Sequence, residues 1–272
     1  MYNYNIKYNM KTILNNRLKY VPTVSQPIDN LSDLPYKPSN PLPAKSFAMY
    51  IVGQPASGKT TLWNSMLISH PTKKKPETPR FYYRLFDKVF LISPSMNTLP
   101  LDKLRLNEDR MYMKFDDKIL ENILDTERED ENLNNLIILD DCIRDLTKSK
   151  ILCKTILNRR HCTHNPDEDG NGGMALMITS QKYNALPLML RCNMSHVIVF
   201  RTENQKELNA IKSELMGDLD DKTANEVLKT AWSKKHGFLF IDATKPTTDR
   251  YYQNFNKIVI DVDTPPPSPE SS

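Results

Sequence analysis

Short apolar runs alternate along the chain with longer stretches in which apolar residues have helical spacing. The runs predict buried strands at 47–52, 88–93, 135–140, 174–179, 196–200 and 238–242, with an edge strand near 256–261. The helical spacing predicts helices over 59–69, 116–126, 146–158, 183–191, 204–215 and 221–234. Strands that alternate with helices are typical of a mostly parallel sheet, so we expect an α/β fold with helices flanking a central sheet.

The two ends of the chain lack this pattern. Residues 1–45 are rich in Asn, Tyr and Pro, and six prolines in the second half of that segment disfavour a long helix. We therefore expect an extended, partly ordered N-terminal arm. Residues 263–272 consist largely of Pro and Ser and predict a disordered tail. Residues 46–262 remain for a single α/β domain.

The net charge of +4 comes from the N-terminal arm, which contains six Lys or Arg side chains and only two Asp. Nucleic-acid-binding domains often carry a basic field, but the rest of this chain is balanced. Any contact with DNA would therefore have to come from local loops or from the arm. No apolar run is long enough to span a membrane, and the first residues lack the apolar core of a secretory signal.

One segment fits the phosphate-binding loop pattern of Gly, four residues and Gly-Lys-Thr, and it lies between a predicted strand and a predicted helix: Gly53-Gln54-Pro55-Ala56-Ser57-Gly58-Lys59-Thr60-Thr61. Backbone N–H groups and the helix N-terminus would face the phosphates. Lys59 would reach the β- and γ-phosphates, and the Thr60 hydroxyl would hold Mg²⁺. With only seven glycines in the chain, a chance match is disfavoured. The loop predicts binding of a nucleoside triphosphate, with ATP and Mg²⁺ as the expected pair.

An acidic pair, Asp140-Asp141, ends the predicted strand at 135–140. Parallel strands bring their carboxyl ends to one edge of a sheet, the edge at which the phosphate-binding loop also opens. Asp140 is expected to hold Mg²⁺ as a Walker-B aspartate, directly or through water. Asp141 is expected to orient or deprotonate the attacking water, although glutamate is commoner in that role. The alternative is a strand that simply ends in a solvated turn.

For other polar residues, spacing alone is compatible with either a functional or a structural role. Gln181, after the strand at 174–179, could lie beside the γ-phosphate or begin the next helix as a cap. Arg159, Arg160 and Arg191 could each neutralise charge in phosphoryl transfer, often from a neighbouring subunit, or be structural.

The basic loop, residues 71–80, is the densest cluster of positive charge and is followed by Phe81, Tyr82, Tyr83 and Arg84. Lysines beside aromatic residues suit a phosphate backbone. A lysine run flanked by prolines is also common in solvated connectors, so both interpretations remain open.

Over residues 46–255 the ordered set of motifs resembles the genome-packaging ATPases of large DNA viruses, the poxvirus-type branch of the FtsK–HerA superfamily. The resemblance depends on the phosphate-binding loop, the acidic pair, Arg159-Arg160-His161, Ser180-Gln181 with Leu186-Pro187, and residues 238–242. It implies a RecA-like (ASCE) ATPase that forms a homo-oligomeric ring and drives double-stranded DNA into a preformed capsid.

The resemblance also implies that Arg160 acts in trans and that Gln181 is the polar sensor. It further implies capsid or portal-vertex partners, in the host cytoplasm, a viral factory or the virion. Two alternatives belong to other classes of protein. Small-molecule kinases share the phosphate-binding loop, and a nucleotide-gated assembly protein would bind ATP without acting as a motor.

Overall fold

The computed structural model describes residues 8–12, 34–99, 101, 104, 106–127, 133–163 and 173–262. The predicted tail at 263–272, much of the predicted arm and residues 164–172 lie outside the described residues. No helix in the described parts of the chain is long and apolar enough to cross a membrane.

Ten strands of the described residues form one sheet in the order β1-β10-β9-β8-β7-β2-β6-β5-β3-β4. The strands from β7 to β4 pair in parallel, and those from β7 to β1 pair antiparallel. Their bounds are β1 (Tyr8–Thr12), β2 (Ala48–Val52), β3 (Lys88–Ile92), β4 (Met111–Tyr112), β5 (Asn135–Leu139), β6 (Met174–Ser180), β7 (His196–Phe200), β8 (Phe238–Asp242), β9 (Tyr251–Gln253) and β10 (Asn256–Val262).

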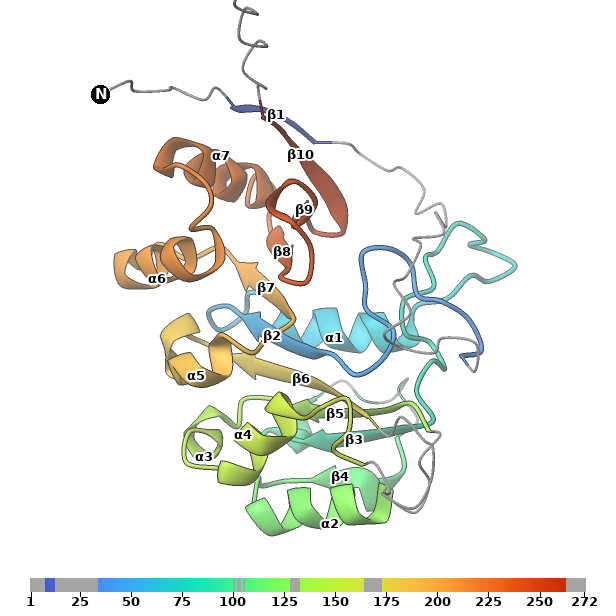
Figure 1. The fold of residues 1–272 in the computed structure, drawn as a ribbon. Coiled ribbons are helices and arrows are strands. Elements are labelled where there is room, and N and C mark those ends of the chain that lie inside the picture. The colour runs from blue at the N-terminus through green and yellow to red at the C-terminus, as the bar shows by residue number, and fades with distance from the viewer. Residues whose placement is uncertain are drawn as a thin grey trace, which may run out of the picture.

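Helices cover both faces of this sheet (Figure 1). They are α1 (Lys59–Ile68), α2 (Asp117–Glu127), α3 (Ile143–Leu146), α4 (Lys150–Leu157), α5 (Leu188–Arg191), α6 (Gln205–Leu215) and α7 (Asp221–Ala231). On one face, α2 to α7 pack on a core that includes Tyr50 and Val52. On the other face, α1 and the loops at 81–86 and 42–47 pack on a second core that includes Met49 and Ile51. Successive residues of β2 thus point into opposite cores, as the pleat of a strand requires.

The expected α/β fold and all seven predicted strands are confirmed within a residue or two. The strand predicted at the edge of the sheet, near 256–261, is instead β10, which lies between β1 and β9. The pattern missed β1, β4 and β9. Strands β4 and β9 have only two and three residues. Strands β1 and β4 are the two outermost strands of the sheet, so a continuous apolar run does not mark them.

Two predicted helices were wrong in extent. The helix expected over 146–158 begins only at Lys150 as α4, while Leu146 ends the separate turn of α3. The Ser149 hydroxyl caps α4 by accepting from Leu152 N at 2.9 Å. The helix expected over 183–191 consists of a 3₁₀ turn at 183–185 and the single turn of α5. Pro187 has no N–H to donate, so a helix that starts near residue 183 cannot run through it, and Pro187 instead precedes α5 as its N-cap residue.

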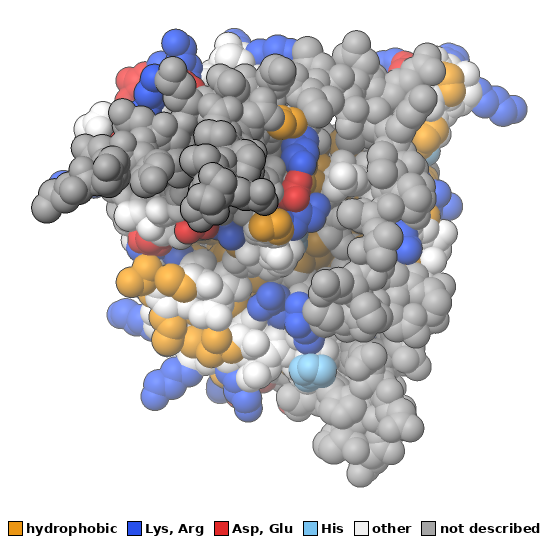
Figure 2. All heavy atoms as spheres, turned by 45° about the horizontal axis from the view of Figure 1, so that its top comes forward, with side chains coloured by type: hydrophobic (Ala, Val, Ile, Leu, Met, Phe, Trp, Pro, Cys, Tyr) orange, Lys and Arg blue, Asp and Glu red, His pale blue; other side chains and the backbone are white. Residues whose placement is uncertain are grey.

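The charge distribution of the folded chain agrees with its near-balanced composition. Figure 2 shows Lys and Arg side chains spread over the described part of one face, with hydrophobic and acidic side chains between them. A single basic field is therefore absent from the described part of that face.

Candidate nucleotide-binding site

The phosphate-binding loop connects β2 to α1 and depends on its two glycines. Gly58 has φ +110°, a left-handed conformation that other residues rarely adopt. A Cβ at Gly53 would lie 2.5 Å from Ser57 Oγ and 2.8 Å from Phe200 Cβ. The loop can therefore close this tightly only with glycine at both positions, and α1 then starts at Lys59 with its N-terminus facing the loop.

Lys59 crosses the mouth of the loop. Its Nζ donates to Gly53 O at 2.6 Å and to Gln54 O at 3.1 Å. Burial lowers the pKa of Lys59, and the carboxylates of Asp141 and Asp140 oppose this effect. The ammonium group is thus held between the loop and the acidic pair that follows β5.

Asp140 is buried, with 4% of its surface exposed, and both side-chain hydrogen bonds that it makes with the described residues involve the same carboxylate oxygen. Trp63 Nε1, from α1, donates to Oδ1 at 3.1 Å, and Thr179 Oγ1, from β6, donates to it at 2.9 Å. Burial raises the pKa of Asp140, while the hydrogen bonds from Thr179 and Trp63 lower it. Three elements therefore hold this carboxylate in place.

Asp141 and Gln181 meet at the surface above Asp140. Gln181 Nε2 donates to Asp141 Oδ2 at 3.2 Å, so the end of β6 contacts the end of β5. Asp141 N donates to Thr179 Oγ1 at 3.0 Å, and Asp141 has φ +56°. That left-handed conformation is uncommon for a residue other than glycine, and such conformations are found disproportionately at functional sites.

Thr60 and Asp140 are suitable ligands for a magnesium ion. Mg²⁺ prefers oxygen donors, and these residues offer a hydroxyl and a carboxylate. The described residues provide no hydrogen-bond donor to Asp140 Oδ2, so that oxygen can accept a cation. The residues present fit the metal that the sequence predicted.

Sequence reasoning missed Trp63 and Thr179, although both orient the acidic pair. A signal existed for Trp63, because its indole N–H must find an acceptor when the ring is buried, and its ring is fully buried. Thr179 ends an apolar run and resembles any β-branched residue of a strand, so spacing alone cannot single it out.

The structure separates the three candidate arginines. Arg159 Nε donates to Ser46 O at 3.0 Å, and Arg159 O accepts from Met174 N at 2.8 Å. Ser46 lies two residues before β2, and Met174 begins β6. The 159–160 turn is therefore at the amino ends of these strands, opposite the carboxyl ends where the phosphate-binding loop lies. Arg160 is exposed there and makes no hydrogen bond or ion pair with the described residues.

Arg191 is a structural residue. Its Nε and Nη2 donate to the two carboxylate oxygens of Glu214 at 2.9 and 2.6 Å, and Nη1 donates to Leu186 O. The hydrogen bonds with Glu214 raise the pKa of Arg191. This bidentate pair fixes α5 against α6, which leaves Arg191 committed within its own subunit.

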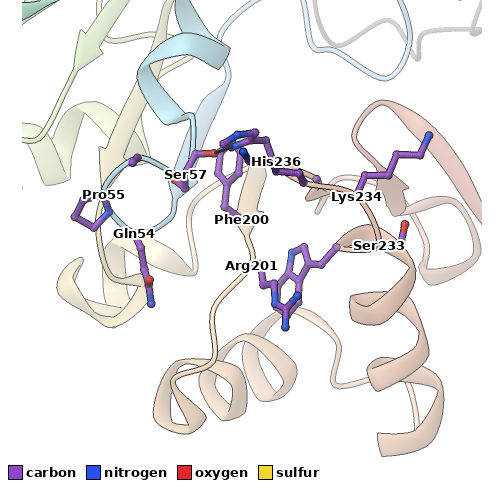
Figure 3. Close-up of a pocket in the computed structure, with 12 residues that line it drawn as sticks. Gln54, Pro55, Ser57, Phe200, Arg201, Ser233, Lys234 and His236 are labelled. Atoms are coloured by element: carbon purple, nitrogen blue, oxygen red, sulfur yellow. Dashed lines mark hydrogen bonds between the residues drawn. The ribbon is translucent and has the colours of Figure 1, made fainter.

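A groove of about 470 Å³ lies between the phosphate-binding loop and the turn at 233–237, which joins α7 to β8. Figure 3 shows His236 reaching the loop at Ser57 beside Phe200, whereas Lys234 points away from it. His236 Nδ1 lies 3.1 Å from Ser57 O and must carry the proton, since a carbonyl only accepts. A second groove, of about 510 Å³, continues past His236 along Thr60, Thr61 and Leu62. The turn therefore borders the space next to the start of α1.

The order of strands and the site together define a P-loop NTPase of the RecA-like class. The loop follows β2, the acidic pair follows β5, and β6 with Gln181 lies between these two strands. All three carboxyl ends therefore meet at one edge of the sheet, where ligands of open α/β sheets bind.

Solved structures with a similar fold include two of a viral ATPase. B204, the DNA-packaging ATPase from Sulfolobus Turreted Icosahedral Virus, aligns at 15% identity with a TM-score of 0.52, over 80% of this chain and 98% of its own. The genome packaging NTPase B204 from Sulfolobus turreted icosahedral virus 2, in complex with ATP-gammaS, aligns with the same identity, coverage and TM-score. At this identity the likeness is one of fold. No family model matches the sequence, and no curated protein matches it.

Proposed function

We propose that the protein is an ATP-hydrolysing motor that translocates double-stranded DNA into a viral capsid as a ring oligomer. The observation that carries the proposal is the meeting of Lys59, Asp140, Asp141 and Gln181 at the edge of the sheet where the phosphate-binding loop opens. The similar fold of B204, a DNA-packaging ATPase, supports the biological setting.

The roles of the residues follow from their positions. Lys59 exchanges the carbonyl oxygens of Gly53 and Gln54 for phosphate oxygens and offsets their charge. Asp141 accepts a proton from water as the water oxygen bonds to the γ-phosphorus and the bond to the bridging oxygen of ADP breaks. Gln181 orients Asp141 through its amide. Mg²⁺, held by Thr60 and Asp140, would neutralise charge on the β- and γ-phosphates.

Arg160 acts on the neighbouring subunit in this proposal. It lies at the edge of the sheet opposite its own phosphate-binding loop and is exposed. It is therefore unsuited to its own site but accessible to a partner. A ring built by head-to-tail contacts brings one edge of each subunit to the opposite edge of the next.

The test is steady-state ATP hydrolysis with and without linear double-stranded DNA. We expect DNA to stimulate hydrolysis by wild-type protein, and Lys59→Ala to abolish both the basal and the stimulated rate. A matched control is Lys206→Ala, an exposed lysine at the start of α6, which should behave as wild type. Hydrolysis indifferent to DNA would contradict the motor, and turnover that requires a nucleoside acceptor would indicate a kinase.

Capsid or portal-vertex proteins are the proposed docking partners, and the host cytoplasm, viral factory or virion is the proposed location. Both follow from the packaging function. Co-sedimentation of the protein with capsids assembled without DNA tests the docking proposal. If the protein does not sediment with these capsids in detergent-free buffer of moderate salt, the docking proposal is contradicted.

A further inference from the structure

A large groove lies at the end of α1 distant from the phosphate-binding loop. It has a volume of about 920 Å³ and is bordered by the end of α1, the basic loop and the segment before β4. We call it the basic groove, and its lining includes His70, Lys75, Tyr83, Arg84 and Arg110. The loops concerned are drawn in cyan on the right of Figure 1. The described part of the nucleotide site contributes no residue to it.

The basic loop is exposed over residues 71–77 but folds into a defined turn. Thr72 and Lys75 exchange two backbone hydrogen bonds of 3.1 Å each, which closes a two-residue turn. Lys73 and Lys74 are exposed at its tip, and Lys75 lines the groove. The nearby acid Asp87 accepts a hydrogen bond from Asn134 N at 2.8 Å and so is partly engaged. Three ammonium groups are thus presented together on a defined turn.

Aromatic rings and guanidinium groups extend this surface. The rings of His70 and Tyr83 stack with centroids 3.8 Å apart, and the Arg84 guanidinium lies 5.3 Å from the centroid of Tyr83. His70 Nδ1 lies 3.0 Å from Ile68 O, which ties the stack to the end of α1. Arg110, just before β4, also lines the groove.

Tyr36, from the N-terminal arm, contacts the end of the basic loop and the residues that follow it. The Tyr36 hydroxyl lies 3.1 Å from Phe81 O and 2.9 Å from Tyr83 O, and the Arg80 guanidinium covers the Tyr36 ring at 3.6 Å. A surface braced in this way loses less conformational entropy on binding than a flexible lysine run.

We infer that the basic groove binds the phosphodiester backbone of duplex DNA. Lys and Arg on an ordered turn supply the charge-assisted contacts that DNA phosphates accept, and no base-reading helix is needed for a sequence-independent motor. The inference rests on the proposed function, for which it names the DNA-contacting surface. Because α1 runs from the nucleotide site to this groove, over about 15 Å for its ten residues, it also links the two sites through one rigid element.

The experiment compares two triple variants that remove the same charge. Lys73→Ala/Lys74→Ala/Lys75→Ala alters the basic loop, and Lys148→Ala/Lys150→Ala/Lys154→Ala alters exposed lysines next to α3 and on α4, which covers the other face. Fluorescence anisotropy of a labelled 30-bp duplex is measured over a range of NaCl concentrations for the full chain, alongside ATP hydrolysis with and without the duplex.

We expect the loop variant to bind DNA at least about tenfold more weakly at 0.1 M salt, with a log–log salt slope smaller by roughly two to three. Its hydrolysis without DNA should equal that of wild type, and its stimulation by DNA should be lost. The control variant should match wild type in every assay. Arg84→Ala/Arg110→Ala should weaken binding independently of the loop.

Failure of this inference is distinguishable from failure of the proposed function. If wild type is stimulated by DNA and the loop variant keeps the wild-type affinity and slope, the groove is not the DNA surface although the motor stands. Equal losses in both triple variants would also overturn the inference, since they would indicate a general charge effect. If wild type binds nucleotide but neither binds DNA nor responds to it, both proposals fail.

Discussion

At the scale of single residues, the Thr179 hydroxyl connects the two acidic residues of the site. Its one oxygen donates to Asp140 Oδ1 at 2.9 Å and accepts from Asp141 N at 3.0 Å. Thr179 is fully buried, so water cannot replace either hydrogen bond. The orientation of the proposed catalytic carboxylate therefore depends on a residue that touches no substrate.

Thr179→Val keeps the shape of the side chain and removes this connection. We expect kcat for ATP hydrolysis to fall roughly 10- to 100-fold, because a small misplacement of a catalytic group is costly. The affinity for a fluorescent ATP analogue should change little, since the phosphate-binding loop is intact. The free energy of unfolding should fall by about 1–2 kcal/mol, because Asp141 N–H loses its buried acceptor. Thr179→Ser retains the hydroxyl and should restore most of kcat, and a wild-type kcat in the valine variant would contradict the role.

Local motifs explain why part of the site was predictable from sequence. The phosphate-binding loop and the Asp140-Asp141 pair are each contiguous in the chain, so their residues report their own chemistry. The contacts of Gln181 with Asp141 and of Trp63 with Asp140 join segments 40 and 77 residues apart. Spacing along the chain does not encode such contacts, and they could be found only in the fold.

At the scale of secondary structure, the parallel strands were predictable because both of their faces are buried. Residues of β2, β5 and β6 are buried along their whole length, which produces the continuous apolar runs in the sequence. The starts of helices α4 and α5 were less predictable, since Ser149 and Pro187 set them and outweigh the apolar spacing. Local capping chemistry decides such boundaries.

Strand β7 carries a buried histidine that makes stability depend on pH. Burial lowers the pKa of His196 from 6.5 to about 4, although Asp242, whose Oδ1 lies 3.4 Å from Nε2, opposes the shift. Between pH 6.5 and 4 the unfolded chain therefore binds a proton at His196 that the folded chain does not. Unfolding is favoured increasingly as the pH falls through this window, and above it the effect vanishes.

We expect His196 to contribute a loss of up to roughly 3 kcal/mol in the free energy of unfolding between pH 7 and pH 4. Urea unfolding of wild type and His196→Asn at several pH values measures it. The variant lacks the ionisable ring, so the difference between the two curves should shrink or change sign as the pH falls. Parallel curves across the window would show that His196 has an ordinary pKa in the folded protein.

At the scale of the whole molecule, the fold separates two sets of phosphate-related residues across the sheet. Lys59, Asp140 and Gln181 lie at the carboxyl ends of the parallel strands, whereas Arg160 and the basic groove lie at their amino ends. The sequence alone could not separate Arg159 from Arg160. The structure does, because Arg159 is engaged with Ser46 O and Arg160 is exposed.

This separation has a consequence for mixed oligomers of two inactive variants. In the proposed ring, a working site takes Lys59 from one subunit and Arg160 from its neighbour. Lys59→Ala and Arg160→Ala should each be inactive alone. In a mixture, an Arg160→Ala subunit next to a Lys59→Ala subunit has an intact Lys59 and faces an intact Arg160, so activity should return.

With equal amounts and random assembly, about a quarter of the interfaces combine the two intact residues, so the mixture should reach up to roughly a quarter of the wild-type rate. The measurement is DNA-stimulated ATP hydrolysis after the two variants are mixed and allowed to exchange subunits. Lys59→Ala mixed with Lys59→Ala/Arg160→Ala is the control that cannot complement, because every subunit lacks the lysine. A mixture of the two single variants that stays as inactive as this control, despite proven subunit exchange, would show that Arg160 does not act across an interface. Recovery would instead require that the amino edge of one subunit faces the nucleotide site of the next.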